Sequence, residues 1–378
     1  MSDDPYVYPG TNVLRNKGGY RTREELDHFE RLMTTEAMKT LPPVEVSPKG
    51  LRKVHEHLFK DVYDWAGEHR IINIRKAVGE IGSEEFRFVP AGQLDRRIDT
   101  LFDQIKNDSK LSVEAIPDFA NALAPHFREL NVIHPFREGN GRTQRLMIQR
   151  IAETNGHRLT FGHITGERMI QDSIDASVRN DPAPLANLIR DAANPITRLE
   201  MTMVLNGFRN AYGEAEMEQF YVTHGRIGDR LEGTLAIDHP NGIVALIDEK
   251  SQRIVIGERA DLSDPKVKLG DEVVLTPSVA SIGNRVIRAV DAIPEQEARK
   301  IPPLHQAIKA MDTIRTIAND QPPTIRNSML ENAPGRIAGL INEGKDPSVI
   351  APKVAEDLKP NAGPSNGPRA GPKAGPSV

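Results

Sequence analysis

The stretch HPFREGNGRTQR, residues 134–145, decides how this chain folds and what it can do. Apolar residues recur at helical spacing up to Asn131, and the helical pattern resumes after the stretch until the helix-ending pair at residues 155–156. The sequence therefore predicts a loop between two helices, with Phe136 packed into the core beneath it. Because glycine lets the backbone approach a ligand and a helix N-terminus attracts negative charge, Gly139 to Gly141 are predicted to form a phosphate cradle.

The side chains around this loop add the remaining parts of a polyphosphate site. Arg142 and Arg145 lie three residues apart, so both can project from one face of the following helix. Residues 128–150 carry five Arg against two Glu, a local charge of +3. Glu138 is a candidate Mg²⁺ ligand, since Mg²⁺ takes one or two carboxylates together with phosphate oxygens. His134 can accept a proton near neutral pH and is the candidate general base.

Composition limits the other functions that the chain could have. It has 378 residues and a net charge of −4, from 49 Lys and Arg against 53 Asp and Glu. No apolar run reaches the ~18 residues of a membrane span, and the N-terminal MSDDPYVYPG has no secretory signal pattern, so neither insertion nor classical export is expected. The absence of cysteine excludes thiol nucleophiles, disulfides and Cys-type zinc sites. A pI near 6.3 argues against a nucleic-acid coat protein.

Helical spacing covers residues 20–194, with one interruption at residues 70–90. There two runs of apolar residues alternate with polar ones and flank a pair of glycines, which predicts a β-hairpin on an otherwise helical domain. The unpaired edge of such a hairpin can dock an extended segment. The alternating residues are Ile72, Ile74, Phe86 and Phe88, and the glycines are Gly79 and Gly82.

Strand-like alternation dominates residues 225–294, after a helical connector at Ile196 to Gln219. Five short strands predict a small barrel of OB type, a fold that often binds single-stranded nucleic acid on aromatic side chains. These residues include no Phe, Tyr or Trp, so a scaffold or interaction role is favoured over nucleic-acid binding. The predicted strands are Thr234–Asp238, Val244–Asp248, Ile254–Ile256, Glu272–Thr276 and Arg285–Ala289.

The C-terminal region is predicted to be short and partly helical. Helices are expected at His305–Ile317 and Pro347–Leu358, separated by Pro322-Pro323 and Pro334-Gly335. From Lys359 onward the composition is rich in Pro, Gly, Ala and Ser, with basic residues and no acid. Such a tail cannot bury enough apolar surface to fold, so it is expected to be disordered.

HPFREGNGRTQR closely resembles the signature of Fic-domain proteins, HxFx(D/E)GNGRxxR, at every specified position. The resemblance extends to the N-terminal DPYVYPGTNVLRNKGGY, to Trp65-Ala66-Gly67 and to the hairpin. A Fic domain followed by an OB fold is similar to bacterial Fic toxins and type IV secretion effectors, although few residues remain here for a C-terminal delivery domain. The resulting division is a mainly α Fic domain with a hairpin flap at 1–195, a connecting helix at 196–219, an OB-like barrel at 220–296, a helical region at 297–358 and a disordered basic tail at 359–378.

The resemblance implies protein adenylylation, in which AMP moves from ATP to a Ser, Thr or Tyr hydroxyl of a target protein. His134 would deprotonate that hydroxyl, and Glu138 would bind Mg²⁺. The hairpin would act as a target-docking flap by strand pairing, and its two basic residues would favour an acidic target. The phosphate-binding residues would be Gly139, Asn140, Gly141, Arg142 and Arg145, and the flap residues Ile72, Asn73, Ile74, Arg75 and Lys76.

Two other functions stay open at this stage: a Fic enzyme that transfers phosphocholine, UMP or phosphate, and a conjugation- or secretion-linked adaptor. The resemblance implies a toxin or effector in the bacterial cytoplasm, or one translocated by type IV secretion machinery into another cell. Its target would be a bacterial type II topoisomerase or a host protein such as a small GTPase. No Glu followed by Gly or Asn has a Ser or Thr four residues before it, so the inhibitory (S/T)xxxE(G/N) helix is not expected and a separate small antitoxin is.

Three further residues are candidates for structural roles. His55 and His57 are two residues apart on a predicted helix and face apart, so a metal site there is not expected. His126 is interpreted as a packing residue beside the motif. Trp65, the single Trp of the chain, is expected in the core or against the hairpin.

Overall fold

We describe a computed structural model of the chain, covering residues 4–78, 84–299 and 301–359. The chain forms two compact units, Met1–Pro277 and Ser278–Val378. Among the described residues, no helix is long and apolar enough to cross a membrane.

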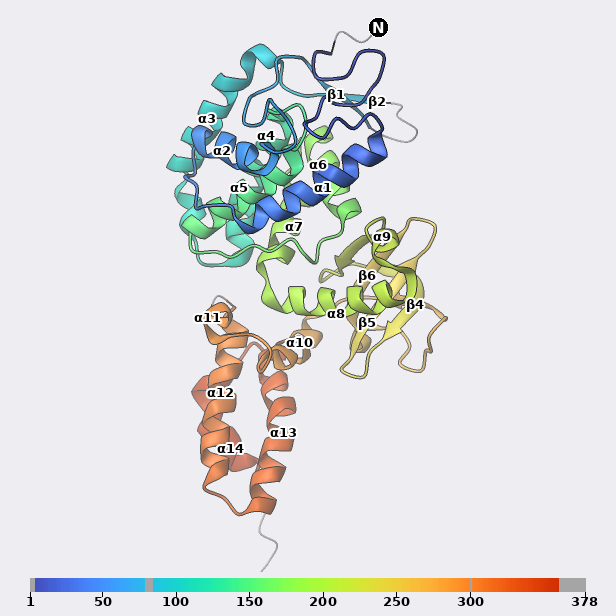
Figure 1. Cartoon of the computed structure of the whole chain (residues 1–378). Helices are drawn as coiled ribbons and strands as arrows, with labels where there is room; N and C mark the ends of the chain where they lie inside the picture. The colour runs from blue at the N-terminus through green and yellow to red at the C-terminus, as the bar shows by residue number, and fades with distance from the viewer. Residues whose placement is uncertain (1–3, 79–83, 300, 360–378) are drawn as a thin grey trace, which may run out of the picture. The chain divides into compact units, whose positions relative to one another are not determined.

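The α-helices α1 to α7 form the first part of the first unit (Figure 1). Hydrogen bonds from capping side chains explain where two of them begin: Thr22 accepts from Glu25 N before α1, and Ser47 accepts from Gly50 N before α2. The helices pack around α4 and α5, which carry the motif between them. Their bounds are α1 Arg23–Lys39, α2 Pro48–Phe59, α3 Leu94–Asn107, α4 Ile116–Ile133, α5 Asn140–Thr154, α6 Gly166–Val178 and α7 Ala183–Ala193.

Helix α4 shows why the motif loop starts where it does. Its apolar stripe, which includes Phe119, Leu123 and Phe127, is completely buried, as the helical spacing predicts. The helix continues through Pro125 and ends at Ile133. It ends there because His134 takes a left-handed backbone conformation, with φ 47°, that cannot continue the helix.

The predicted hairpin is confirmed as strands β1 Arg75–Val78 and β2 Glu84–Arg87, which pair antiparallel with Arg75 opposite Arg87. Two flap residues expected on the first strand, Ile72 and Ile74, lie in the segment just before β1. The predicted turn glycines, Gly79 and Gly82, lie outside the described residues.

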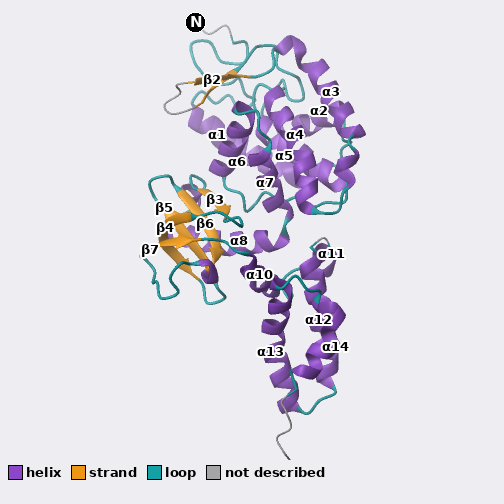
Figure 2. Cartoon of the chain, turned by 180° about the vertical axis from the view of Figure 1, so that it is seen from behind, coloured by secondary structure: helices purple, strands orange, loops and turns teal. Residues whose placement is uncertain are grey.

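A five-stranded sheet follows α8 Pro195–Tyr212 and α9 Glu214–Met217, in the order β3-β6-β5-β4-β7 (Figure 2). Strand β3 pairs parallel with β6, and the other pairs are antiparallel. No pairing among the described residues joins β3 to β7, so the sheet is not a closed barrel. The bounds are β3 Tyr221–His224, β4 Leu231–Asp238, β5 Ile243–Asp248, β6 Arg253–Glu258 and β7 Glu272–Leu275.

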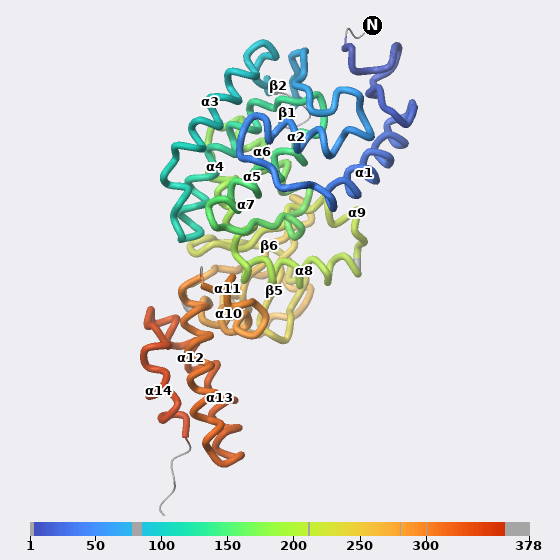
Figure 3. The backbone as a smooth tube through the Cα atoms, turned by 60° about the vertical axis from the view of Figure 1, so that its left-hand side comes forward, coloured from blue at the N-terminus to red at the C-terminus, as the bar shows by residue number. Residues whose placement is uncertain are grey.

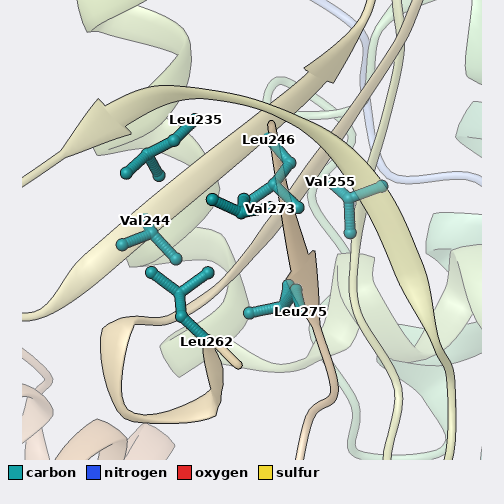
Figure 4. Packing of buried hydrophobic residues seen from close by; sticks show 7 residues of the cluster. All are labelled: Leu235, Val244, Leu246, Val255, Leu262, Val273 and Leu275. Carbon is teal, nitrogen blue, oxygen red and sulfur yellow. The ribbon is translucent and has the colours of Figure 1, made fainter. Parts of the chain in front are cut away.

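The sheet has its own apolar core, made by side chains that gather on one side of the curved strands (Figure 4). Strand β5 is buried over Ile243–Ile247, which fits its central place in the sheet. The predicted fifth strand at Arg285–Ala289 is wrong, because this segment belongs to helix α10, which spans Ile282–Ala289. The core residues are Leu235, Val244, Leu246, Val255, Leu262, Val273 and Leu275.

The outer edge of β3 is bonded to the helical part of the first unit. The Thr165 hydroxyl donates to the Phe220 carbonyl at 2.6 Å, and Arg168 Nη1 donates to the Val222 carbonyl at 3.2 Å. Arg168 is completely buried and also binds Asp191 Oδ2 at 2.6 Å. The sheet is therefore fastened to α6 and α7 through backbone carbonyls and a buried ion pair.

The second unit is helical, with α12, α13 and α14 beside one another (Figure 3). The prolines around residues 322–335, which predict a break, instead start α13 and lie within it: Pro323 is its first residue and Pro334 is inside. Helix α10 takes Arg285–Ala289 because Gly283, Val286 and Ala289 are buried at a spacing of three, which matches one helix face. The bounds are α10 Ile282–Ala289, α11 Glu295–Ala298, α12 Pro302–Asn319, α13 Pro323–Asn342 and α14 Pro347–Asp357.

Candidate active site

His134 stands at the junction of α4 and the motif loop, where its backbone is held from both sides. Its N–H donates to the Leu130 carbonyl at 3.1 Å, and its own carbonyl accepts from Arg70 Nε at 2.9 Å. The imidazole stacks on Phe88, with ring centroids 4.0 Å apart. Burial, followed by the positive charge of Arg70, lowers the pKa of His134 to about 3. The ring is therefore neutral at physiological pH and free to accept a proton.

Arg70 is a buried residue that the sequence interpretation did not select. Besides the His134 carbonyl, its guanidinium donates to the carbonyls of Ile72, Val89 and Ile133. These carbonyls come from both ends of the hairpin and from the end of α4. Arg70 therefore ties the base of the predicted flap to the residue that carries the candidate base.

The loop between His134 and α5 is held by its own side chains. Phe136 is fully buried, as predicted. The Asn140 side chain closes the loop on itself: its Oδ1 accepts from Phe136 N at 2.9 Å, and its Nδ2 donates to the Phe136 carbonyl at 2.7 Å. Gly139 has φ 80°, and a Cβ there would lie 2.3 Å from the Phe59 ring, so only glycine fits. Asn140 thus shapes the cradle with its side chain and can offer a ligand only its backbone.

Helix α5 begins at the cradle, directly after Gly139, and has no side-chain cap. Its first amide N–H groups lack partners within the helix, and a helix N-terminus of this kind is suited to binding an anion. Arg142 and Arg145 lie on its first two turns. Burial, followed by the charge of Arg142, lowers the pKa of Arg145. Two cations held this close favour a ligand with several negative charges.

Glu138 is the exposed member of the loop. Its Oε1 accepts from Gly139 N at 3.0 Å, which leaves the other carboxylate oxygen towards solvent. Among the described residues, no group of three or more His, Cys, Asp or Glu side chains could hold a metal ion by itself. A metal at Glu138 would therefore need most of its ligands from a substrate and from water.

The structure adds His55 of α2 to the site. Its Nδ1 accepts from Gly67 N at 2.8 Å, so the proton must be on Nε2, which donates to the Glu138 carbonyl at 3.0 Å. The ring is fully buried and stacks on Phe136, with centroids 3.8 Å apart. Burial lowers the pKa of His55 to about 3. A neutral His55 therefore fixes the loop against α2 and the Trp65–Gly67 turn.

Known proteins with a similar sequence identify the family. The Fic/DOC family model matches residues 45–152. Probable protein adenylyltransferase y4lH of Sinorhizobium fredii is 36% identical over 190 residues, which is 50% of this chain and 95% of that protein. The chain belongs to the Fic/DOC family.

Two further Fic relatives are larger or structurally known. A protein adenylyltransferase of Bartonella henselae is 30% identical over 207 residues, but the match spans only 38% of its length. The solved structure of the type IV secretion system effector protein BepA superposes with a TM-score of 0.63 at 26% identity, covering 72% of this chain and 96% of that one. The latter match extends the similarity in fold well beyond the residues of the Fic motif.

The structure brings the motif residues of this Fic protein together. The other candidate residues, His126, His57 and Trp65, make structural contacts. His126 Nε2 lies 2.9 Å from Asp108 Oδ2, and His57 Nε2 lies 3.0 Å from the Ala37 carbonyl. Trp65 stacks on Tyr63, with centroids 4.3 Å apart. The role of His55 could not be read from sequence, because its partners at Gly67 and Glu138 are 12 and 83 residues away.

Proposed function

We propose that this Fic protein is a protein adenylyltransferase, which transfers AMP from ATP to a hydroxyl group of a target protein. The observation that carries this proposal is the complete motif at residues 134–145, folded into a rigid loop with a neutral histidine at one end and two arginines at the other. The name of the Sinorhizobium relative, which the chain matches over nearly its full length, supports the same activity.

His134 acts as the general base. It accepts the proton of the target hydroxyl, whose oxygen attacks the α-phosphorus of ATP. A bond forms between the hydroxyl oxygen and the α-phosphorus as the bond from that phosphorus to the α,β-bridging oxygen breaks, and pyrophosphate leaves. Stacking on Phe88 holds the imidazole in place for this proton transfer, and the hydrogen bond from Arg70 to the His134 carbonyl holds the backbone.

The phosphates of ATP lie at the start of α5. The backbone N–H groups of Asn140 and Gly141 face them, and Arg142 and Arg145 bind the β- and γ-phosphates. These contacts orient the α-phosphorus for in-line attack and stabilise the charge that builds on the leaving pyrophosphate. Catalysis here consists of positioning and charge neutralisation by groups that are held before ATP arrives.

Glu138 fits a Mg²⁺ ion that is shared with the phosphates. Its carboxylate is exposed at the rim of the cradle and keeps one oxygen free, which matches the one or two carboxylates that Mg²⁺ takes beside phosphates and water. When bound, the ion would neutralise phosphate charge. Removing the carboxylate charge with Glu138→Gln should raise the Mg²⁺ concentration needed for half-maximal labelling. An unchanged Mg²⁺ titration would remove Glu138 from this role.

Incubation of a cell lysate with the protein and labelled ATP, followed by mass spectrometry, tests the proposal. An AMP adduct on a Ser, Thr or Tyr residue, absent with His134→Ala, is expected. Adducts of phosphocholine, UMP or phosphate would instead assign the same site to another transfer. If no adduct forms with any donor, the adaptor function becomes the better hypothesis.

The flap residues Ile72, Asn73, Ile74, Arg75 and Lys76 are proposed to dock the target. The outer edge of β1 offers backbone groups for strand addition, and its exposed basic side chains suit an acidic segment. A bacterial type II topoisomerase is the preferred target and a host protein such as a small GTPase the alternative. The modified protein in the lysate experiment decides between them.

A toxin or effector role fits this activity. The structural likeness to BepA supports an effector that acts after translocation by type IV secretion machinery, while a toxin would act in the bacterial cytoplasm. A separate small antitoxin is proposed to silence the enzyme through a Glu that reaches Arg145. Co-expression with the neighbouring small open reading frame should abolish growth inhibition. Strong inhibition of the purified single chain, relieved by truncation, would show an internal inhibitor instead.

These roles are proposed to belong to different parts of the chain. The proposed parts are 1–195, 196–219, 220–296, 297–358 and 359–378. Strand order supports a partly open barrel of OB type for the third part, since β4, β5 and β6 form a meander and β7 pairs with β4. The compact first unit ends at Pro277, nineteen residues before the proposed end of this module at residue 296. Its proposed role is that of a scaffold beside the Fic domain.

A further inference from the structure

Arg142, the first arginine that the Fic signature specifies, is already bound by the N-terminal helix α1. Arg142 Nη2 donates to the Glu30 carboxylate, and Arg142 Nη1 donates to the Thr34 hydroxyl at 3.0 Å. Glu30 and Thr34 are four residues apart and so lie on the same face of α1. Their separation from Arg142 in sequence exceeds one hundred residues, so these contacts depend on the tertiary fold.

The carboxylate that holds Arg142 is itself fixed. Its second oxygen accepts from the Tyr63 hydroxyl, and both Glu30 and Tyr63 are buried, at 8% and 1% exposed. Burial, followed by the charge of Glu30, raises the pKa of Tyr63, so the phenol stays protonated and donates. The Tyr63 ring is held in turn by stacking on Trp65. Glu30 therefore cannot swing away without breaking contacts in the core.

The donors of Arg142 are only partly used by these contacts. A guanidinium has five N–H donors, and Glu30 and Thr34 each take one. The Arg142 side chain keeps 23% of its surface exposed. Its guanidinium carbon lies 4.9 Å from the centre of the Phe59 ring, the same ring that Gly139 packs against. The remaining donors are thus beside the cradle and can bind phosphate oxygens.

We propose that Glu30 is a positioning residue of the nucleotide site, which together with Tyr63 fixes the Arg142 guanidinium in the orientation that meets the phosphates of ATP. This inference rests on the proposed adenylyltransferase function. Glu30 is buried and both its oxygens have partners, so its carboxylate is fixed at Arg142 and does not project into the cradle. Helix α1 is therefore part of the active site although it carries no motif residue.

The test is steady-state adenylylation with ATP varied, comparing wild type with Glu30→Gln. Because the amide can no longer hold the guanidinium by charge, kcat should fall about tenfold, the usual scale for losing a charge-assisted hydrogen bond. KM for ATP should change little, since lost positioning is expressed in the transition state. Glu24→Gln, on an exposed position of the same helix, is the matched control and should behave as wild type.

A double-mutant comparison separates positioning from a general loss of structure. In an Arg142→Ala background, Glu30→Gln should cause no further loss of kcat, because Glu30 acts through Arg142. Tyr63→Phe, which keeps the ring on Trp65, should lower kcat in the same direction by a smaller factor. These comparisons still distinguish positioning from a loss of structure if Glu30→Gln lowers the melting temperature.

Several outcomes would overturn the inference. An unchanged kcat in Glu30→Gln would show that Arg142 needs no anchor. A lower KM for ATP with kcat retained or raised would show that Glu30 competes with phosphate. A further loss in the Arg142→Ala background would show a role in folding alone. Failure of the wild-type enzyme to transfer AMP would instead refute the proposed function, so the two failures can be told apart.

Discussion

The motif loop and the hairpin β1–β2 are joined by Arg70 but are built in opposite ways. In the loop, Pro135, Phe136, Gly139 and Asn140 are buried, and hydrogen bonds within the protein fix the backbone. In the hairpin, the strand residues 75–77 are exposed, and the ion pairs of Arg75 and Arg87 lie at the surface. A rigid loop suits chemistry that needs fixed geometry, whereas an exposed hairpin leaves its surface for a partner. If the hairpin docks the target as proposed, target choice can change without altering the motif loop.

The sharpest test of this contrast is His134→Ala. Loss of a general base should lower AMP transfer by about a thousandfold. ATP binding, measured by calorimetry, should remain near the wild-type affinity because the α5 N-terminus and both arginines are intact. His126→Ala, which removes a histidine paired with Asp108 outside the loop, is the control. Equal labelling by wild type and His134→Ala would refute the base assignment.

Replacing Arg70 should lower the stability of the fold. Replacing it with Met leaves four carbonyl groups without their buried donor, so the free energy of unfolding should fall by about 3 kcal/mol. Urea denaturation measures this loss. Arg96→Met, at an exposed position of α3, should change stability by less than about 0.5 kcal/mol. Similar midpoints for both variants would mean that Arg70 does not join the hairpin to the loop.

Changes in the hairpin should affect the target more than the chemistry, although the charge of Lys76 also contributes to the lowered pKa of His134. Lys76→Glu reverses an exposed charge of β1, so labelling of an acidic target should fall about fivefold at low salt and less at high salt. ATP affinity and melting temperature should stay the same. Lys106→Glu, at an exposed position of α3, is the matched charge reversal. If both variants label the target equally well, Lys76 makes no electrostatic contribution to docking.

Ile74→Pro tests whether the backbone of the hairpin contributes to docking. Ile74 lies directly before β1, so proline there should distort the start of the strand and reduce labelling of the target severalfold. Automodification should persist because the loop is untouched. Unaffected labelling of the target in lysate would move docking elsewhere, with the five-stranded sheet as the next candidate.

A further expected effect concerns pH. Burial lowers the pKa of both His55 and His134 from 6.5 to about 3, so the unfolded chain binds more protons than the folded one below pH 6.5. Stability is therefore complete above pH 6.5 and is lost as pH falls towards 3. His55→Gln, which can donate and accept at similar places, should flatten this dependence. Melting temperatures measured across this range give the comparison, and an equally steep decline in His55→Gln would contradict it.

Sequence reasoning succeeded where local pattern decides the outcome. The motif between two helices, the buried Phe136 and the hairpin all follow from residues near one another in the chain. It failed at Arg285–Ala289, where β-branched residues favour a strand but a helix face is buried. It also failed at α13, because tertiary packing tolerates Pro334 inside the helix.

The supporting residues of the site could not be predicted for another reason. Arg70 lies outside every motif, and the sequence around His55 suggests nothing beyond a metal ligand. Glu30 follows no pattern at all, since its partner Arg142 is 112 residues away. Each of these side chains acts by touching the motif in space, and a single sequence does not record such contacts.

The fastening of β3 to α6 has a consequence for how this chain can be cut or recombined. Arg168 is completely buried with Asp191, and the carbonyl of Val222 belongs to the same cluster. A fragment that ends before β3 would lack the Val222 carbonyl. It would also expose the buried charges of Arg168 and Asp191 to water, at a cost of several kcal/mol. In this chain the Fic helices and the sheet therefore stabilise each other, and a truncation before β3 should lower the melting temperature of the Fic part.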